Sequence, residues 1–189
     1  MQRGRDKFLK YRSFILFFVR LFSVFPNKFL NKLLIFFRGT KGNKGLVIRY
    51  ILLKCLAKSI GENVSVHPGV YLFSPEGLSI GNNVSIQPMC YIDASGEIEI
   101  GNDVSIAHGV TLLSTSHSYS DLNLVIKDQE LIKKKTVINS NVWLGAKATI
   151  LCGVTIETGS IVGAGAVVCT DIRMNSVVGG VPAKLIKKR

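Results

Sequence analysis

Histidine is the side chain best suited to moving a proton at neutral pH, and this chain contains only three. His117 lies in the polar, irregular segment 115–121, whereas His67 and His108 each lie within two residues of regularly spaced aliphatic residues. Long irregular segments in repetitive proteins are usually functional, because a rigid scaffold can hold a residue there while the loop covers it. Of the three histidines, His117 is therefore the strongest candidate for a catalytic residue.

The same three histidines would also be compatible with a metal site. Ligands of zinc must converge on one ion at similar short distances. His67 and His108 are separated by two repeats of the chain, and His117 stands at the mouth of the irregular segment. We therefore expect no metal.

The four cysteines show neither metal-ligand spacing nor a paired framework. None has an identifiable activating partner, so none is assigned as a nucleophile. We interpret them as reduced and structural, which is typical of a cytoplasmic protein. They are Cys55, Cys90, Cys152 and Cys169.

A six-residue repeat must position these groups. Isoleucine-glycine units begin at Ile60, Ile80 and Ile100, twenty residues apart, and an aliphatic residue returns at every sixth position within each unit. This period fits neither a helix nor a two-sided strand, but three hexads close one triangular coil of a parallel β-helix. A β-sandwich or barrel would not keep a strict hexad. The repeat stops after Leu112 and resumes at Ile138, so an inserted loop is expected at about 113–137.

The composition divides the chain into a basic arm, 1–58, and a nearly neutral solenoid, 59–189. The arm contains fourteen Lys or Arg and one acidic residue, whereas the remainder contains ten Lys or Arg and eleven acidic residues. Nine of the ten phenylalanines lie in the first 37 residues. We expect helices over about 8–25 and 28–37, a loop over 40–45, and a helix over 46–59.

The apolar runs of the arm are too short and too often interrupted by charge to cross a bilayer. Two interpretations of residues 1–38 stay open: an interfacial anchor on anionic lipid, or a cap on the open end of the solenoid. A secretory signal is disfavoured because no small-residue cleavage site follows, and the arm has no recognisable nucleic-acid motif.

The chain resembles the left-handed β-helix acyltransferases, in particular the sugar O-acetyltransferase branch that includes galactoside and maltose acetyltransferases. The resemblance covers about 59–189, and it rests on the hexads together with four further motifs. These are Thr115-Ser-His117, Asn141-Val-Trp143-Leu-Gly145-Ala, Gly163-Ala-Gly165-Ala and Gly180-Val-Pro182-Ala-Lys184.

This resemblance implies left-handed coiling, a homotrimer with active sites between subunits, and acetyl-coenzyme A as acyl donor. It makes His117 the general base and places Gln87 and Asp93 near the acceptor sugar. Lysines stand where the family often has arginines near the coenzyme phosphates, which keeps the charge but loses the bidentate fork. The implied coenzyme residues are Trp143, Ala146, Ala164, Cys169, Thr170, Lys184 and Lys187.

The expected function is O-acetylation of a surface polysaccharide or its sugar precursor, in the cytoplasm or at the inner face of the membrane. A serine acetyltransferase is the main alternative, although its usual N-terminal domain is longer and more acidic than this arm. A non-catalytic scaffold is the other alternative, and the joint presence of His117, Trp143 and the terminal basic residues disfavours it.

Overall fold

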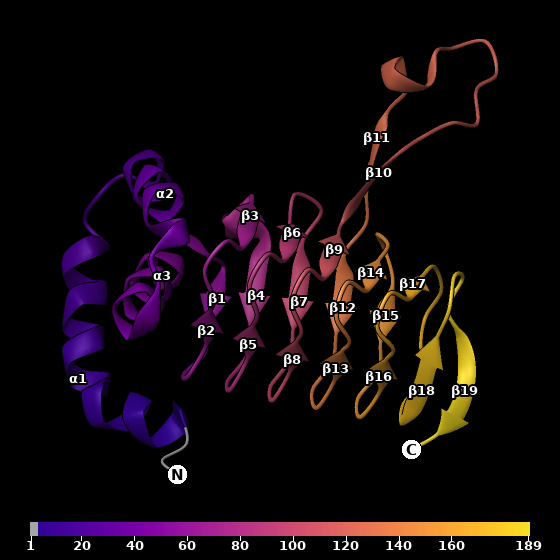
Figure 1. The fold of residues 1–189 in the computed structure, drawn as a ribbon. Coiled ribbons are helices and arrows are strands. Elements are labelled where there is room, and N and C mark those ends of the chain that lie inside the picture. The colour runs from indigo at the N-terminus through magenta and orange to yellow at the C-terminus, as the bar shows by residue number, and fades with distance from the viewer. Residues whose placement is uncertain (1–3) are drawn as a thin grey trace.

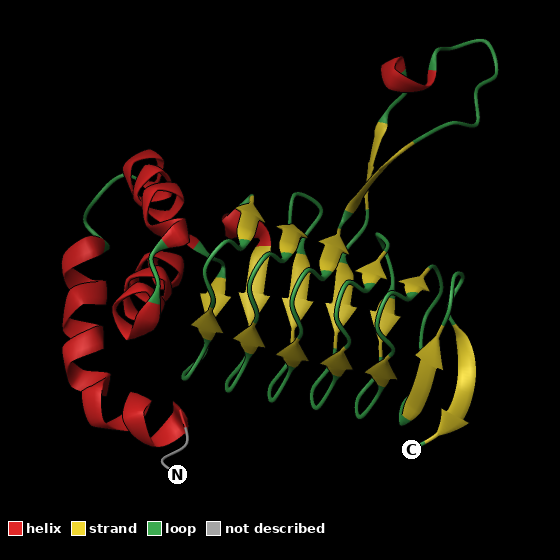
Figure 2. Ribbon diagram, viewed as in Figure 1, coloured by secondary structure: helices red, strands yellow, loops and turns green. Residues whose placement is uncertain are grey.

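The computed structural model describes residues 4–189, so the first three residues of the basic arm lie outside the described part. Helices occupy one end of the molecule, and a triangular parallel β-helix forms the rest (Figures 1 and 2). Sheet 1 contains β1 (Ser59–Ile60), β4 (Leu78–Ile80), β7 (Ile98–Ile100), β12 (Thr136–Ile138) and β15 (Thr155–Ile156). Sheet 2 contains β2 (Ser65–Val66), β5 (Ser85–Ile86), β8 (Ser105–Ile106), β13 (Trp143–Leu144), β16 (Ile161–Val162), β18 (Ser176–Gly179) and β19 (Lys184–Lys188). Sheet 3 contains β3 (Tyr71–Phe73), β6 (Tyr91–Asp93), β9 (Thr111–Leu113), β14 (Thr149–Ile150) and β17 (Val167–Val168).

The aliphatic residues of the hexads stack from coil to coil in all three sheets. Ile80 pairs with Ile100, and Ile100 pairs with Ile138 across the inserted segment, so the register continues past the interruption. These side chains are buried, apart from Leu72, which is only partly buried beneath the helical arm. The predicted fold class, a parallel β-helix of hexapeptide repeats with an N-terminal helical arm, is therefore confirmed.

Polar side chains stabilise the corner between sheets 1 and 2, which we call the asparagine corner (61–64, 81–84, 101–104 and 139–142). The backbone N–H of Glu62 donates to Asn82 Oδ1 at 2.7 Å, and that of Asn82 donates to Asn102 Oδ1 at 2.7 Å. Asn83 has a φ of 58°, and its side-chain amide donates to Asp103 Oδ1 at 3.0 Å. Asparagine tolerates this left-handed conformation better than most residues, and its amide satisfies the next coil.

The arm forms α1 (Gly4–Phe22), α2 (Asn27–Phe36), the short 3₁₀ helix η1 (Phe37–Gly39) and α3 (Gly42–Leu56). The loop predicted over 40–45 is wrong for residues 42–45, because α3 already begins at Gly42, and α3 ends at Leu56, before the predicted residue 59. A Cβ at Gly45 would lie 2.1 Å from the carbonyl oxygen of Thr40. The absence of a side chain at Gly45 therefore lets the first turn of α3 pack under the preceding chain.

The helices cover the open end of the solenoid and share its hydrophobic core, which includes Ile15 and Leu30 as well as the hexad residues. Polar contacts reinforce this packing: the hydroxyl of Tyr50 donates to the carbonyl of Gly61 at 2.9 Å, and Arg12 Nε donates to Glu62 at 2.7 Å. Burial raises the pKa of Tyr50 to about 12. The end of the β-helix is thereby protected from edge-to-edge association. Within residues 4–189, no helix is long and apolar enough to span a bilayer.

Candidate active site

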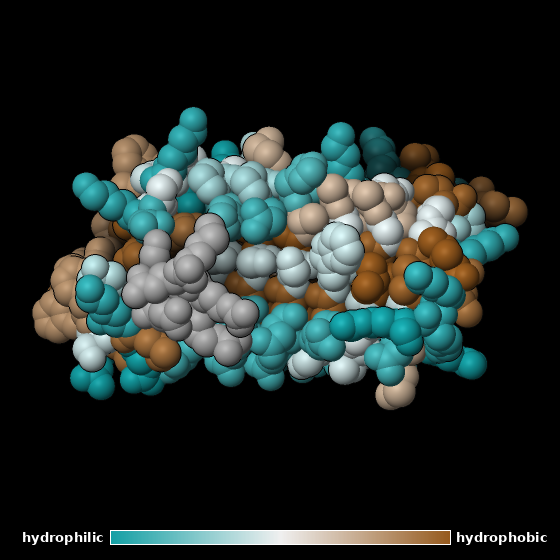
Figure 3. Space-filling view, turned by 60° about the horizontal axis from the view of Figure 1, so that its bottom comes forward, coloured by the Kyte–Doolittle hydropathy of each residue, from teal (hydrophilic) through white to brown (hydrophobic). Residues whose placement is uncertain are grey.

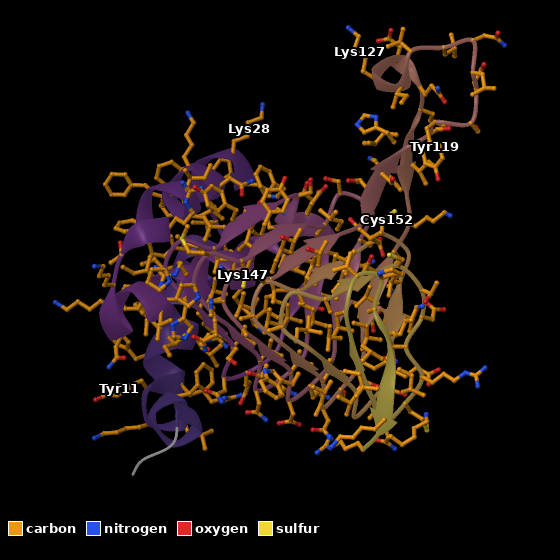
Figure 4. All side chains as sticks on the ribbon, turned by 45° about the vertical axis from the view of Figure 1, so that its right-hand side comes forward. Tyr11, Lys28, Tyr119, Lys127, Lys147 and Cys152 are labelled. Carbon is orange, nitrogen blue, oxygen red and sulfur yellow. The ribbon has the colours of Figure 1, made fainter. Side chains whose placement is uncertain are left out.

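Three successive coils carry extra residues at the same corner, between sheets 3 and 1. We call it the insertion corner (74–77, 94–97 and 114–135). The first insertion contains the 3₁₀ helix η2 (Pro75–Gly77), and the third is the long interruption of the hexad. That third insertion opens as an antiparallel pair, β10 (Thr115–His117) and β11 (Leu131–Lys133), with η3 (Ile126–Asp128) at its tip. Figure 1 shows this hairpin projecting from the solenoid, and Figure 4 shows Lys127 at its tip and Tyr119 nearer the solenoid.

His117 is the last residue of β10 and stands exposed opposite Leu131. The hairpin is held just beyond it, where the N–H of Ser118 donates to the carbonyl of Glu130 at 2.9 Å. Within residues 4–189, the imidazole forms no hydrogen bond of its own. Both ring nitrogens of His117 are therefore available to a bound substrate.

Asp93 connects the solenoid wall to the base of this hairpin. Its carboxylate accepts hydrogen bonds from the Thr115 hydroxyl at 2.7 Å and from the Ser95 hydroxyl and N–H at 2.6 and 3.1 Å. Burial acts to raise the pKa of Asp93, but these donors and the positive charge of Lys133 outweigh it and hold the pKa below its ordinary value. Asp93 therefore stays ionised, and it is hydrogen-bonded to Thr115, which lies two residues before His117 along the chain.

Three aromatic residues on the outer face of sheet 3 were not foreseen from the sequence, and we call them the aromatic strip (Tyr71, Phe73 and Tyr91). The Phe73 and Tyr91 rings lie 5.0 Å apart, and Phe73 is the register partner of Asp93. Aromatic faces offer apolar surface to the C–H faces of a sugar ring. A signal was present, because these residues flank the inward-pointing Leu72 and Ile92 at matching places in two repeats.

Gln87, which was expected near Asp93, follows β5 at the corner between sheets 2 and 3. Its N–H donates to the carbonyl of Ile106 at 2.9 Å, which holds the backbone in the ladder. His67 and His108 lie at the same corner in the neighbouring coils. Asp93 is the last residue of β6, whereas Gln87 lies at the corner before that strand, so one chain does not present both residues at one corner.

The residues assigned to the coenzyme lie mainly on the side of the solenoid away from the hairpin. Trp143 projects from β13 on sheet 2, and Lys184 and Lys187 are exposed on β19, which pairs antiparallel with β18. Ala146 and Ala164 follow at the corner between sheets 2 and 3, where a Cβ at Gly145 would meet the N–H of Ala164 at 2.6 Å.

Cys169 and Thr170, also assigned to the coenzyme path, instead follow β17 of sheet 3, on the side where the hairpin begins. Figure 1 places the hairpin at the top and β13 at the bottom of the solenoid. The structure therefore does not bring His117 and Trp143 together within one chain.

All four cysteines are free. Burial raises the pKa values of the Cys55 and Cys90 thiols, which makes both poor nucleophiles. Cys152 lies on the solenoid near the foot of the hairpin (Figure 4), and Cys169 is exposed. Among the residues described, no group of three histidine, cysteine or acidic side chains is placed to hold a metal ion.

Comparison with known proteins agrees with this architecture. Residues 135–170 match the bacterial transferase hexapeptide (six repeats) family. The galactoside O-acetyltransferase of Escherichia coli (strain K12) is 36% identical over 141 residues, which cover 74% of this chain and 68% of that protein. A putative lipopolysaccharide biosynthesis O-acetyl transferase of the same strain is 42% identical over 73 residues, which cover 39% of this chain and 37% of that protein.

Solved structures extend the likeness to most of the chain. A maltose O-acetyltransferase from Clostridium difficile 630 superposes with a TM-score of 0.76 at 28% identity and covers 88% of both chains. A galactoside acetyltransferase in complex with coenzyme A gives a TM-score of 0.74 at 30% identity, over 84% of this chain and 78% of that one.

The fold and these matches define a hexapeptide-repeat acyltransferase. More narrowly, the chain belongs to the family of sugar O-acetyltransferases that contains the galactoside enzyme. The resemblance inferred from the sequence is confirmed.

Proposed function

We propose that this protein transfers an acetyl group from acetyl-coenzyme A to a hydroxyl of a carbohydrate, with His117 as the general base. The observation that supports this most is the convergence of His117, the ionised Asp93 network and the aromatic strip on one side of the solenoid. Relatives described as galactoside and maltose O-acetyltransferases, and one solved with coenzyme A, favour the sugar acceptor and the donor.

A sugar hydroxyl is almost fully protonated at neutral pH and attacks a thioester only as a base removes its proton. In the proposed step, the free imidazole of His117 takes the hydroxyl proton while the oxygen bonds to the acetyl carbonyl carbon. The resulting oxyanion is stabilised by hydrogen-bond donors of the site. The carbon–sulfur bond then breaks, and the thiolate of coenzyme A takes the proton from the imidazolium. The products are an acetyl ester and the free thiol, with no acyl-enzyme.

The aromatic strip and Asp93 are suited to the acceptor. Tyr91 and Phe73 provide a surface on which a sugar ring can lie, and the carboxylate of Asp93 keeps lone pairs for sugar hydroxyls. Leu131 and the rest of the hairpin lie beyond the place proposed for the sugar ring, and they limit the directions from which a longer glycan can enter. An acceptor that is part of a polysaccharide, or its sugar precursor, fits this open and extended surface.

We further propose a homotrimer in which two neighbouring chains complete each active site. The support is that His117 and Trp143 lie on different sides of one chain, whereas transfer needs the donor and the base together. Figure 3 turns sheet 2 toward the viewer and shows apolar residues toward the end of the solenoid opposite the helical arm. Exposed side chains on or next to this sheet include Trp143, Val181 and Ile186. Such a surface is suited to contact with another copy in a closed ring.

The arm is the part of the protein that we propose to contact the anionic surface of the inner membrane, from the cytoplasm. A groove of about 650 Å³ runs between its three helices and is lined only by apolar side chains. The arm also carries almost all the excess positive charge of the chain. Apolar contact and attraction to anionic lipid together are what stable interfacial binding requires. The lining residues include Phe14, Phe18, Phe25, Phe29 and Leu33.

Point variants test this contact better than removal of residues 1–38, because that deletion would also strip Ile15, Leu30 and Leu34 from the shared core. Phe14→Ser with Phe29→Ser changes two exposed side chains that line the groove. The double variant should lose co-sedimentation with anionic liposomes and keep the melting temperature of the unchanged protein. Unchanged liposome binding would reject the membrane contact.

The catalytic proposal is tested by thiol release from acetyl-coenzyme A with three acceptor classes: serine, simple sugars and oligosaccharides. Release with a carbohydrate, together with an acetylated glycan detected by mass spectrometry, is expected. Preferential acetylation of serine would instead establish the serine acetyltransferase alternative, and the absence of release with every acceptor would favour a scaffold.

A further inference from the structure

A small cavity lies between α2 and the first coil of the solenoid, next to the aromatic strip. Its volume is about 160 Å³, well below the roughly 300–1,000 Å³ of pockets that hold a whole drug-sized ligand. A cavity of this size suits one functional group of a ligand. Two arginines, Arg38 and Arg49, contribute to its lining, together with Asn31, Tyr71 and Phe73.

Arg49 is an unusual residue to find in the core, because it is only 1% exposed and has no carboxylate partner among the described residues. Its Nε donates to the carbonyl of Val66 at 2.8 Å, and Nη1 donates to those of Thr40 at 2.8 Å and Phe37 at 3.0 Å. Nη2 is buried and makes no hydrogen bond. Burial lowers the pKa of this guanidinium.

A buried, uncompensated cation with a free donor is costly, because neither water nor a counter-charge replaces its lost hydration. The arm offers few counter-charges, since residues 1–58 contain fourteen basic residues and a single acidic one, Asp6. An anion that enters from outside would relieve this cost.

Arg38 adds a second positive charge at the same cavity. Its guanidinium lies over the ring of Tyr71, 3.9 Å from the ring centre, and this stacking restrains the side chain. Among the side chains that the structure describes, those of residues 8–189, no carboxylate pairs with it. Two guanidinium groups that share one small cavity are suited to phosphate or carboxylate, which arginine binds in a bidentate manner.

The cavity also lies in line with the candidate active site. Phe73 lines it, and Phe73 is the register partner of Asp93, which is in turn hydrogen-bonded to Thr115 at the base of the hairpin. Adjacent coils are about 4.8 Å apart. A ligand with its anionic group in the cavity could therefore lay a sugar ring across Phe73 and Tyr91 and extend toward His117.

We propose that this cavity is a binding site for a phosphate or carboxylate group, and that the group belongs to the acceptor. The acceptor would then be an anionic glycan or a glycosyl phosphate. The assignment to the acceptor rests on the proposed acetyltransferase function, whereas the anion site itself does not. A phosphate of a lipid headgroup has the same chemistry, and the experiment below separates the two sources.

Binding is measured first, by titration calorimetry of the full-length protein with inorganic phosphate in the presence of saturating coenzyme A, which blocks the coenzyme site. Arg38→Gln should weaken phosphate binding about tenfold, the loss expected from one charge-assisted contact. Lys32→Gln is the matched control, since it removes one positive charge from α2 without touching the cavity. Equal affinity in Arg38→Gln and the unchanged protein, or an equal loss in Lys32→Gln, would overturn the anion site.

The source of the anion is decided by two further measurements on Arg38→Gln. If the acceptor supplies the group, KM should rise about tenfold for an anionic oligosaccharide and stay constant for its neutral counterpart, with kcat little changed. Unchanged KM values with a loss of binding to anionic liposomes would overturn the acceptor assignment in favour of a headgroup. Phosphate binding does not need catalysis, so a protein that binds phosphate through Arg38 but acetylates nothing would refute the proposed function and leave the anion site standing.

Arg49→Lys provides a second check at the buried position. Lysine keeps the charge but has no fork with which to bind both the carbonyls and an anion. At a temperature where the variant is folded, it should bind phosphate more weakly than the unchanged protein does, even if its melting temperature without phosphate is nearly the same. A melting temperature that falls while the phosphate affinity stays constant would show that Arg49 serves only to hold the chain.

Discussion

The asparagine corner and the insertion corner are both rich in polar residues, yet their side chains are used differently. At the asparagine corner each amide or hydroxyl binds the next coil, as when the N–H of Asn102 donates to Ser140 Oγ at 3.0 Å. At the insertion corner the polar groups converge on a single carboxylate, Asp93, beside an exposed histidine. Polar residues that follow the repeat stabilise the solenoid, whereas those that interrupt it are available for chemistry.

The strongest test of this contrast is His117→Ala, which removes the proposed base from the insertion corner. Turnover should fall by roughly 10²–10⁴, with the affinity for acetyl-coenzyme A and the melting temperature nearly unchanged. Steady-state kinetics and calorimetry measure both quantities. A variant that keeps more than about a tenth of the original rate would exclude His117 as the base.

Asp93→Asn tests whether the carboxylate serves the acceptor. We expect KM for the acceptor to rise about tenfold, because an ionised hydrogen-bond acceptor is replaced by a neutral amide. The pKa of Asp93 is lowered in the folded protein, so any stability from its ionisation is present above its ordinary pKa and is lost only as the pH falls through the lower folded value. Asp93 therefore stays ionised between pH 7 and pH 5, and any change in activity over this range should be the same in Asp93→Asn as in the unchanged protein. A pH dependence in this range that is present in the unchanged protein and absent in the variant would contradict the lowered pKa.

Asn83→Ala is the matched change at the asparagine corner. It places alanine at a φ of 58° and removes hydrogen bonds to Asn63 and Asp103, which should lower the free energy of unfolding by about 2 kcal/mol. The kinetic constants at a temperature where the variant is folded should not change. Chemical denaturation and steady-state assays on one preparation measure the free energy of unfolding and the kinetic constants. A catalytic defect without a loss of stability would contradict the distinction between the two corners.

The C-terminal strand gives the smallest expected effect. Removal of Lys187, Lys188 and Arg189 should raise KM for acetyl-coenzyme A several-fold at low salt and less at high salt, because screened charge contacts weaken as ionic strength rises. These residues are exposed on or just after β19. If the truncation leaves KM for acetyl-coenzyme A unchanged at every salt concentration, the tail does not contact the coenzyme.

The hexads predicted the solenoid well because each buried aliphatic residue is fixed by its own coil and its two neighbours. The interruption after Leu112 likewise located the hairpin, and the position of His117 followed from it. The pairing of β10 with β11 did not follow, since residues 115–117 and 131–133 have no repeat to fix their register. The start of α3 at Gly42 was missed for a similar reason: glycine opposes helix propensity, and only the packing of Gly45 against Thr40 favours it.

The aromatic strip and the buried Arg49 depend on contacts between the arm and the first coils. The repeat places Tyr71 and Phe73 on either side of Leu72, but their role becomes visible only when Arg38 and α2 are placed beside them. Arg49 lies among apolar residues of α3, where the sequence alone predicts an exposed charge. Long-range packing, rather than local pattern, determines both features.

The central claim is that one active site combines the insertion corner of one chain with sheet 2 of another. Inactive His117→Ala protein can be mixed by co-expression with Trp143→Ala protein, which should bind acetyl-coenzyme A weakly. In mixed trimers about a quarter of the shared sites regain both native residues. We predict that, at low acetyl-coenzyme A, the mixture is clearly more active than the average of the two parents. Activity equal to that average would contradict a site shared between chains.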